Sequence, residues 1–280
     1  MARVSIITPA FAATEHLPCA VASVLAQGFD DWEMLIVSDD GEDYRARFAQ
    51  HSLTDGRLRF LASYVYGSGP HVARNPGLRV ATGEFIAPLD ADEVYYPDRP
   101  ERLVALAADH GMAGDNLHVV EAHGGRCLQT VFPLDPKVQC LVLEDFCRFS
   151  VPLLFVFHLS VIGAAWDEDV GFCEDTLFTL RALEQAGQAV IDAESLHGSR
   201  VHPASICHGP DAVARAETAY RFCLQRLREN GLGFRTRRYR EAVTAILHRK
   251  RVLNRAYCRA RHGFAGSFQH DLVTHQGIGT

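Results

Sequence analysis

The chain has 280 residues, of which 48% are hydrophobic and 22% are charged, and its formal net charge is -6. This is the composition of an ordinary globular protein, and one large α/β domain, with or without an appendage, fits the length better than two equal domains. No run of about 18 apolar residues occurs, which argues against a membrane-spanning helix. The first residues pass directly into strand-like sequence without a signal-peptide layout. We therefore expect a cytoplasmic protein.

Eight cysteines are scattered along the chain, and none forms a C-x-x-C pair. This spacing argues against a zinc ribbon and against a thioredoxin-like motif. We expect reduced thiols, most of them buried.

Strand and helix patterns alternate over the first hundred residues. Runs of β-branched and other apolar residues predict strands, and apolar residues three or four positions apart predict helices. Thr14 is the expected N-cap of the first helix, and Gly83 is the expected left-handed cap that closes the third. The expected strands are 3–8, 32–38, 57–61 and 84–89, and the expected helices are 15–27, 43–51 and 72–81. Such alternation predicts a mostly parallel, doubly wound sheet.

The second half of the chain has weaker patterns and a basic end. Residues 235–262 carry ten Arg or Lys and one acid, so the rest of the chain is acidic. This segment is either a helix that packs on the domain with a solvated face or a surface that docks on an anionic membrane. The acidic body argues against a nucleic-acid partner. Mixed strands are expected at 117–120, 127–132 and 153–157, and helices at 174–187, 211–229 and 239–260.

Polar residues follow three of the expected strands, at Thr8-Pro9, Asp39-Asp40 and Asp90-Ala91-Asp92. Ligands bind outside the carboxyl ends of parallel strands, so these residues should converge on one crevice. Two carboxylates one residue apart can ligate a hard divalent cation, which in turn neutralises a diphosphate. Acids after a strand are also common turn and cap residues, so Asp90 and Asp92 do not decide the function alone.

Two further residues of the first half have both a functional and a structural interpretation. A carboxylate at Asp39 could accept from the imide N–H of uracil or from the equivalent edge of guanine, or it could belong to a turn. Arg74, near the start of a helix, could pair with phosphate, with one of the acids, or with a surface partner.

The second half offers two more candidates. Glu174 and Asp175 open a helix, where the helix dipole favours acids, but a carboxylate beside an anomeric carbon could also deprotonate an acceptor hydroxyl. His202, in a turn before Pro203, could join a metal or diphosphate site, although a single histidine is more often structural or solvated.

Five segments in this order resemble the family-2 glycosyltransferases of the GT-A fold. The likeness is continuous over about residues 3–105 and patchy to 205. It is carried by VSIITPAF at 4–11, ASVLAQGFDDWEMLIVSDDG at 22–41, ARNPGLRVATGEFIAPLDADEVYYPDRPER at 73–102, and the segments 171–183 and 199–205. The resemblance implies a GT-A catalytic domain at 1–205, with a nucleotide-binding half at 1–105 and an acceptor-side half at 106–205. A basic helical extension at 206–280 would follow it.

The same resemblance implies the roles of the site residues. Asp39 would read the base, Asp90 would face the ribose and donor sugar, and Asp175, with Glu174 beside it, would be the catalytic base. The implied reaction is inverting transfer from a nucleotide-diphosphate sugar, with a UDP-sugar favoured, to a glycan or lipid-linked acceptor in cell-surface polysaccharide synthesis. The implied donor-binding residues are Thr8, Pro9, Ala10, Phe11, Asp39, Arg74, Asp90 and Ala91, and the implied ligands of Mn²⁺ or Mg²⁺ are Asp92, Asp90 and His202.

Three positions depart from the family pattern: Ala12 stands in place of Asn, Glu93 in place of a second Asp after the metal motif, and Ser199 in place of Tyr. Glu93 keeps the charge, so metal binding is expected to survive. Two alternatives stay open. The chain could be a catalytically silent GT-A-like module that binds a nucleotide or glycan. It could also be a sugar-phosphate nucleotidyltransferase, which would want a glycine-rich basic loop where residues 8–13 stand.

Overall fold

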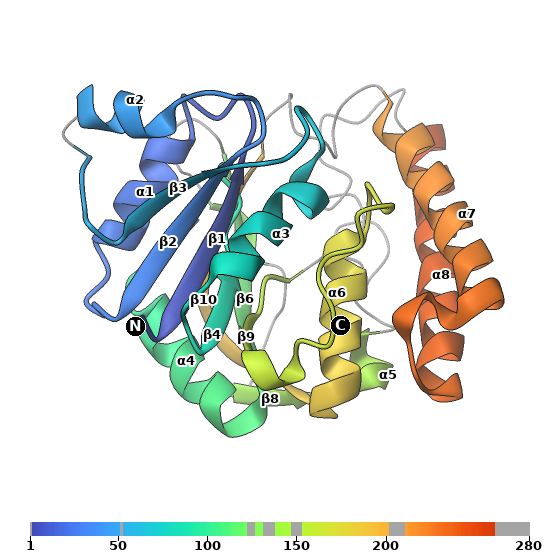
Figure 1. The fold of residues 1–280 in the computed structure, drawn as a ribbon. Coiled ribbons are helices and arrows are strands. Elements are labelled where there is room, and N and C mark those ends of the chain that lie inside the picture. Colours follow the sequence, from blue (N-terminus) through green and yellow to red (C-terminus); the bar gives the residue numbers. More distant parts are fainter. Residues whose placement is uncertain are drawn as a thin grey trace.

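The computed structural model describes residues 2–50, 53–121, 127–130, 138–146, 153–201 and 211–260. A large sheet runs through this part of the chain, and helices cover both of its faces (Figure 1). The strands are β1 Val4–Ala10, β2 Trp32–Ser38, β3 Leu58–Ala62, β4 Phe85–Pro88, β5 Glu93–Tyr95, β6 Met112–Glu121, β7 Cys127–Thr130, β8 Val138–Leu141, β9 Val156–His158 and β10 Ala189–Val201. The helices are α1 Leu17–Leu25, α2 Tyr44–Gln50, α3 Pro70–Val80, α4 Arg99–His110, α5 Leu143–Phe146, α6 Glu174–Ala186, α7 Ala212–Asn230 and α8 Arg237–Ala260, with short 3₁₀ turns at Leu159–Val161 and Gly231–Gly233.

The first four strands form the parallel block that the sequence predicts, in the order β3-β2-β1-β4. Beyond β4 the sheet becomes mixed, because β9 runs antiparallel to both β4 and β6 while β10 runs parallel to β6. The strand β5 closes the far edge against β10. The predicted α/β architecture is present, and the parallel arrangement holds for the four strands β1 to β4.

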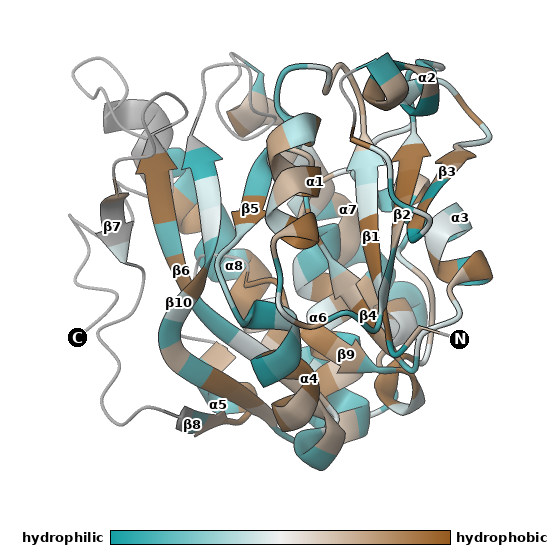
Figure 2. Cartoon of the chain, turned by 90° about the vertical axis from the view of Figure 1, so that its left-hand side faces the viewer, coloured by the Kyte–Doolittle hydropathy of each residue, from teal (hydrophilic) through white to brown (hydrophobic). Residues whose placement is uncertain are grey.

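Side chains of the central strands alternate between two hydrophobic cores, as the two-residue period of a strand requires. In β1, Val4 and Ile6 enter the core under α1, α2 and α4, whereas Ile7 enters the core that α6, α7 and α8 share. The strands that cross the middle of the sheet accordingly carry long hydrophobic segments in Figure 2. Both faces of the sheet are therefore closed to water, and its functional groups are confined to the ends of the strands.

Two predicted helix boundaries are wrong. The N-cap of α1 is His16 rather than Thr14, and its side chain makes no capping hydrogen bond. Gly83 does not end α3 in a left-handed conformation, since α3 ends at Val80 and Ala81 is extended. Gly83 is instead required for close packing on β1: its N–H donates to Ser5 Oγ at 2.9 Å, and a Cβ there would lie 2.6 Å from the Ser5 nitrogen.

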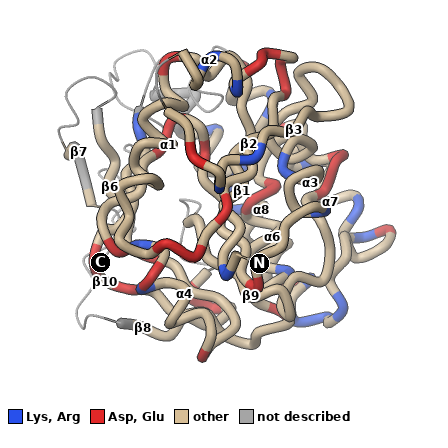
Figure 3. Tube along the Cα trace, turned by 60° about the vertical axis from the view of Figure 1, so that its left-hand side comes forward, with Lys and Arg blue, Asp and Glu red and all other residues tan. Residues whose placement is uncertain are grey.

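The C-terminal helices α7 and α8 lie side by side next to α6 (Figure 1). Tyr239 anchors α8, because its ring is buried and its hydroxyl donates to the Leu183 carbonyl of α6 at 3.1 Å. Lys and Arg are interspersed with Asp and Glu over most of the trace (Figure 3). Among the described helices, none is both long and apolar enough to cross a membrane. The division at residue 205 into a catalytic domain and an extension stays a prediction.

Candidate active site

The ends of β1 and β2 place Asp39 at the predicted edge of the sheet. Its N–H donates to the Ala10 carbonyl at 2.8 Å, and its side chain is only 3% exposed. The carboxylate accepts three hydrogen bonds from the segment that follows β3, from Ser63 Oγ and Ser68 Oγ at 2.6 Å and from the Gly69 N–H at 2.8 Å. A carboxylate has about four lone-pair sites, so Asp39 can accept one more donor.

Two aromatic side chains lie in the segments that follow β1 and β3. Phe11 follows β1 directly and contacts Tyr66 edge to face, with ring centroids 5.8 Å apart. Both rings are exposed, Tyr66 by 75%. Thr8, by contrast, is buried in β1, and its hydroxyl makes no hydrogen bond to another described residue. Pro9 and Ala10 lie in β1 between Thr8 and Phe11, so the residues predicted to form the pocket wall are consecutive in the chain.

Asp40 makes a different set of contacts from the neighbouring Asp39. Its carboxylate accepts from the Ala12 N–H at 2.6 Å, from the Glu42 N–H at 3.0 Å and from the Tyr44 hydroxyl at 2.8 Å. Burial raises the pKa of Asp40, but these hydrogen bonds outweigh it and leave the pKa below the usual range. Ala12 has a left-handed φ of 48°, a conformation that Asn tolerates better than Ala. Asp40 therefore holds the backbone at Ala12 in this conformation.

Arg74 joins the predicted donor-binding acid to the predicted catalytic base. The guanidinium is 1% exposed, and it donates to Asp90 Oδ1 at 2.5 Å and to Asp175 Oδ1 at 2.8 Å. Glu174 Oε1 lies 3.6 Å from the same nitrogen that bonds Asp175. The contact spans 101 residues of sequence and brings the end of β4, α3 and the start of α6 together. Of the three kinds of partner considered for Arg74, the structure shows pairing with the acids, Asp90 and Asp175.

The three carboxylates around one guanidinium do not all carry a charge. Burial, and next the charge of Asp175, raise the pKa of Glu174 to about 8, so Glu174 is protonated at neutral pH. Burial also raises the pKa of Asp90 above its usual range, against the opposing effect of Arg74. The Asp90 side chain is 36% exposed, however, and solvent screening limits this shift. Arg74 makes its two direct contacts with Asp90 and Asp175.

Trp166 and Asn75 complete the surroundings of Asp175, and the sequence analysis assigned neither to the site. Asn75 exchanges two hydrogen bonds with the main chain of Trp166, and the indole Nε1–H donates to Asp175 Oδ1 at 3.3 Å. The only signal in the sequence was the rarity of tryptophan, of which the chain has 2.

His71 was also missed, and it lies between the two halves of the site. Burial, followed by the charge of Arg74, lowers the pKa of His71, so the ring is neutral at pH 7. Its Nδ1 is buried without a hydrogen-bond partner among the described residues. The ring packs where a Cβ on Gly69 would lie only 2.7 Å away, and Gly69 has a φ of +92°. Gly69 is therefore needed both for space and for backbone conformation.

The acids after β4 separate into two environments. Asp90 engages one carboxylate oxygen with Arg74, and Asp92 is partly buried in the same turn. Glu93 points into a buried pair with His197 of β10, whose Nε2 lies 2.9 Å away. The charge that Glu93 keeps is thus directed at His197, and the survival of metal binding stays a prediction. Ala91 packs against the core under α1.

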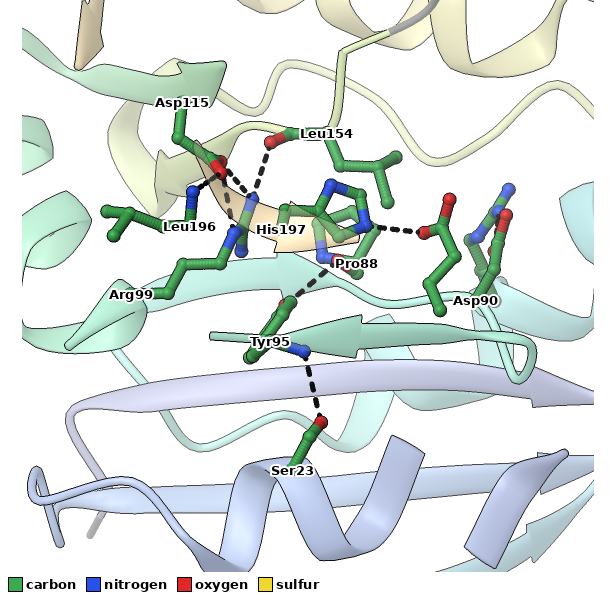
Figure 4. A network of polar contacts seen from close by, with 11 residues as sticks. Ser23, Pro88, Asp90, Tyr95, Arg99, Asp115, Leu154, Leu196 and His197 are labelled. Carbon is green, nitrogen blue, oxygen red and sulfur yellow. Dashed lines mark hydrogen bonds and ion pairs between the residues drawn. The ribbon is translucent and has the colours of Figure 1, made fainter. Parts of the chain in front are cut away.

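A fully buried network supports this turn from below (Figure 4). Arg99 and Asp115 are both 1% exposed at the side chain and pair at 2.9 Å, and the Arg99 guanidinium stacks 4.3 Å from the centre of the Tyr95 ring. Tyr95 donates to the Pro88 carbonyl at 3.0 Å and contacts His197 edge to face. The end of β4 is therefore held on a rigid base.

In the part of the chain that the structure describes, no group of three or more His, Cys, Asp or Glu is arranged to hold a metal ion. Mg²⁺ is commonly bound by only one or two carboxylates together with substrate phosphates. Asp90 and Asp92, two hard oxygen donors at one strand end, fit that kind of site. His202 lies outside the described residues.

Comparisons with known proteins show a similarity to glycosyltransferases. Residues 5–136 match the model of the family described as Glycosyl transferase family 2. The UDP-Glc:alpha-D-GlcNAc-diphosphoundecaprenol beta-1,3-glucosyltransferase WfgD of Escherichia coli is 35% identical over 103 residues, which are 37% of this chain. That match spans only 40% of the length of WfgD.

Two solved structures share the fold over most of the chain. Residues 1–349 of TarS of S. aureus, in complex with UDP-GlcNAc, superpose with a TM-score of 0.62 at 16% identity, covering 92% of this chain and 88% of that TarS chain. The mannosyltransferase PcManGT of Pyrobaculum calidifontis, in complex with GDP-Man and Mn²⁺, gives 0.58 at 16% identity, covering 99% and 80%. The predicted GT-A fold class, with C-terminal helices, is confirmed.

Proposed function

We propose that this chain, whose residues 5–136 belong to glycosyltransferase family 2, transfers a sugar from a UDP-sugar to a glycan or lipid-linked acceptor. The observation that carries the proposal is the buried Arg74, which holds Asp90 and Asp175 at the mouth of the parallel strands. The TarS complex with UDP-GlcNAc and the lipid-linked substrate in the name of WfgD support the donor and acceptor classes.

Asp39 and Phe11 would bind the donor at its base. The remaining acceptor site of the Asp39 carboxylate suits one imide N–H, and the exposed Phe11 ring offers a stacking surface. Asp90 would face the ribose and sugar. A Mn²⁺ or Mg²⁺ ion held by Asp90 and Asp92, with His202 as a third candidate, would neutralise the charge of the departing diphosphate.

Asp175 would act as the general base of a single displacement. Its carboxylate takes the proton of the acceptor hydroxyl while the acceptor oxygen forms a bond to the anomeric carbon. The bond from that carbon to the diphosphate breaks, and the nucleotide leaves with the electron pair. Attack from the face opposite the leaving group inverts the anomeric carbon. Arg74 stabilises the ionised carboxylate by charge, and Glu174 stays protonated beside it.

The experiment that tests the proposal compares wild type with D175N and the matched control D109N. Asp109 is an exposed residue near the end of α4. We expect wild type and D109N to release UDP from a UDP-sugar with Mn²⁺ and an acceptor extract, and D175N to lose at least about a hundredfold in kcat. If neither transfer nor hydrolysis occurs across a donor panel while nucleotide still binds, the chain is a silent binding module and the enzyme proposal is wrong.

Contact of residues 235–262 with an anionic membrane stays a prediction. The structure reduces the charge available for it, because Arg238 pairs with Glu144, and Arg251 and Arg255 pair with Glu217. A membrane surface attracts each accessible Lys or Arg by about 1 kcal/mol, so internal pairing weakens the attraction. Sedimentation with anionic vesicles at low and high salt tests it.

A further inference from the structure

The main chain of Trp166 is fixed to the helix that carries Arg74. Asn75 Nδ2 donates to the Trp166 carbonyl at 3.0 Å, and Asn75 Oδ1 accepts from the Trp166 N–H at 3.0 Å. Both hydrogen bonds are buried and come from one side chain. Trp166 therefore keeps a constant position relative to α3, although 91 residues separate it from Asn75 in the sequence.

The indole ring is fixed as well. It stacks on Phe178 of α6 with the ring centroids 3.9 Å apart and the planes 3° from parallel. The Arg74 guanidinium lies 5.7 Å from the ring centre on the α3 side. A large side chain held by both helices cannot rotate without breaking these contacts, so the direction of its N–H is set in advance.

This N–H reaches Asp175 on the same oxygen as Arg74. Oδ1 accepts from Arg74 at 2.8 Å and from Trp166 Nε1 at 3.3 Å. Among the described residues, none donates a hydrogen bond to Oδ2 of Asp175. Two donors on one oxygen prevent the carboxylate from rotating about its Cβ–Cγ bond. The other oxygen is then the one presented to a substrate.

We propose that Trp166 is a positioning residue that fixes Oδ1 of Asp175 and so leaves Oδ2 as the oxygen that takes the acceptor proton. This rests on the proposed function, in which Asp175 is the base. Arg74 supplies charge to the carboxylate, while the neutral indole supplies orientation. Small errors in the position of a catalytic group are costly in rate, so the direction of the carboxylate should matter for kcat.

The test is W166F, which keeps an aromatic ring on Phe178 but removes the N–H. We expect kcat to fall about three- to tenfold while KM for the donor stays within about twofold, because the lost interaction acts on the base and not on donor binding. W32F is the matched control. Trp32 is buried in β2, and its Nε1 has no hydrogen-bond partner in the described residues. We expect W32F to keep the kcat of wild type.

The variant D175N distinguishes a failure of this inference from a failure of the proposed function on which it rests. If D175N keeps the wild-type kcat, Asp175 is not the base and the proposed mechanism fails, whatever Trp166 does. If D175N is inactive but W166F has the kcat of wild type, the mechanism stands and the positioning role is wrong.

Fluorescence provides a test that does not need W166F to fold. The chain has 2 tryptophans, so W32F leaves Trp166 as the sole tryptophan emitter. Adding D175N to W32F removes a carboxylate hydrogen-bonded to the indole, and the emission maximum should shift. An emission spectrum that is identical in W32F and in W32F/D175N would show that the contact is absent and would overturn the inference.

Discussion

Arg74 is a buried cation whose three carboxylate neighbours respond to it differently. Asp90 and Asp175 bond it directly, at 2.5 and 2.8 Å, whereas Glu174 lies 3.6 Å away. A buried acid without a close cationic partner keeps its proton, because ionisation in a low-dielectric site costs more than the weak attraction returns. Glu174 is therefore the group whose titration should couple most visibly to stability.

We predict that the stability of the wild type falls as pH rises from about 5 to about 8. The pKa of Glu174 is about 8 in the folded chain, against a usual value of 4.5. In this range the folded state binds the proton more tightly, so raising the pH favours unfolding. E174Q cannot ionise and should remove the part of this slope that Glu174 causes, which is on the order of a few kcal/mol over the range.

Urea unfolding of wild type, E174Q and the control E229Q at several pH values measures the effect. Glu229 is exposed on α7, so E229Q should follow the wild-type curve. Curves for wild type and E174Q that run parallel from pH 5 to 8 would contradict the raised pKa.

The candidate site residues that the sequence predicted either follow a strand or lie near the start of a helix, as Arg74 and Asp175 do. Asp39, Asp90 and Asp92 were found because hydrophobic runs end in acids, and parallel strands bring those ends to one edge. Trp166 lies in a segment without periodicity, and His71 lies in the first turn of α3, where the helical pattern does not mark it as a site residue. Their role depends on contacts across about 90 or more residues, such as the pair of Trp166 with Asn75, which no local pattern encodes.

At the scale of helices and strands, apolar periodicity located the elements but not their ends. The error at Gly83 is instructive. Glycine after a helix suggests a left-handed cap, yet here it is required because β1 passes too close for a Cβ. The distinction depends on which strand lies alongside, and this is tertiary information.

The sequence predicted both α7 and α8, but it did not predict that the two helices pack against each other. Glu217 of α7 accepts hydrogen bonds from Arg251 and Arg255 of α8 at 2.7 and 3.1 Å and from Arg221 at 3.0 Å. The hydrogen bond from Arg251 is the main cause that lowers the pKa of Glu217 to about 2. A carboxylate with three arginines is a network rather than an isolated surface pair.

We predict that E217Q destabilises the chain by about 1–3 kcal/mol, because it removes the charge that Arg251 and Arg255 share. E241Q is the matched control: Glu241 pairs with Arg237 on α8, but the two side chains are 63% and 91% exposed. An exposed pair of this kind contributes about 0–1 kcal/mol, so E241Q should stay near wild type. Thermal and urea unfolding of both variants at neutral pH measure the difference. Equal losses of stability in E217Q and E241Q would show that the network around Glu217 adds nothing to the packing of α7 on α8.

At the scale of the whole molecule, the sequence predicted the fold class, but it predicted the distribution of charge only in part. Alternating elements imply a doubly wound sheet almost irrespective of detail. The basic C-terminal segment was equally plain, but the sequence could not show that Arg238, Arg251 and Arg255 find acids within the chain. Net charge along the sequence therefore overestimates the positive potential that α8 presents to a partner.

Donor binding should be visible as stabilisation of the whole chain, since a ligand that binds only the folded state shifts the unfolding equilibrium by mass action. At about a hundredfold excess over Kd, a UDP-sugar with Mn²⁺ should add about 2.7 kcal/mol, which raises Tm by roughly 5–10 °C for a chain of this size. GDP- and dTDP-sugars should give smaller shifts, and a chelator should remove most of the shift if Asp90 and Asp92 act through a metal ion.

The variant D39A tests whether Asp39 contributes to this stabilisation by binding the nucleotide base. The variant loses the acceptor of Ser63, Ser68 and Gly69, so its own Tm without ligand is expected to be lower, and each shift must be measured from that baseline. We expect the UDP-dependent shift of D39A to fall to about a third or less of the wild-type shift, because the proposed function has this buried carboxylate accept from the imide N–H. D109A, at the exposed end of α4, should keep the full shift. A full shift in D39A would remove Asp39 from the nucleotide site and move base recognition to the aromatic pair Phe11 and Tyr66.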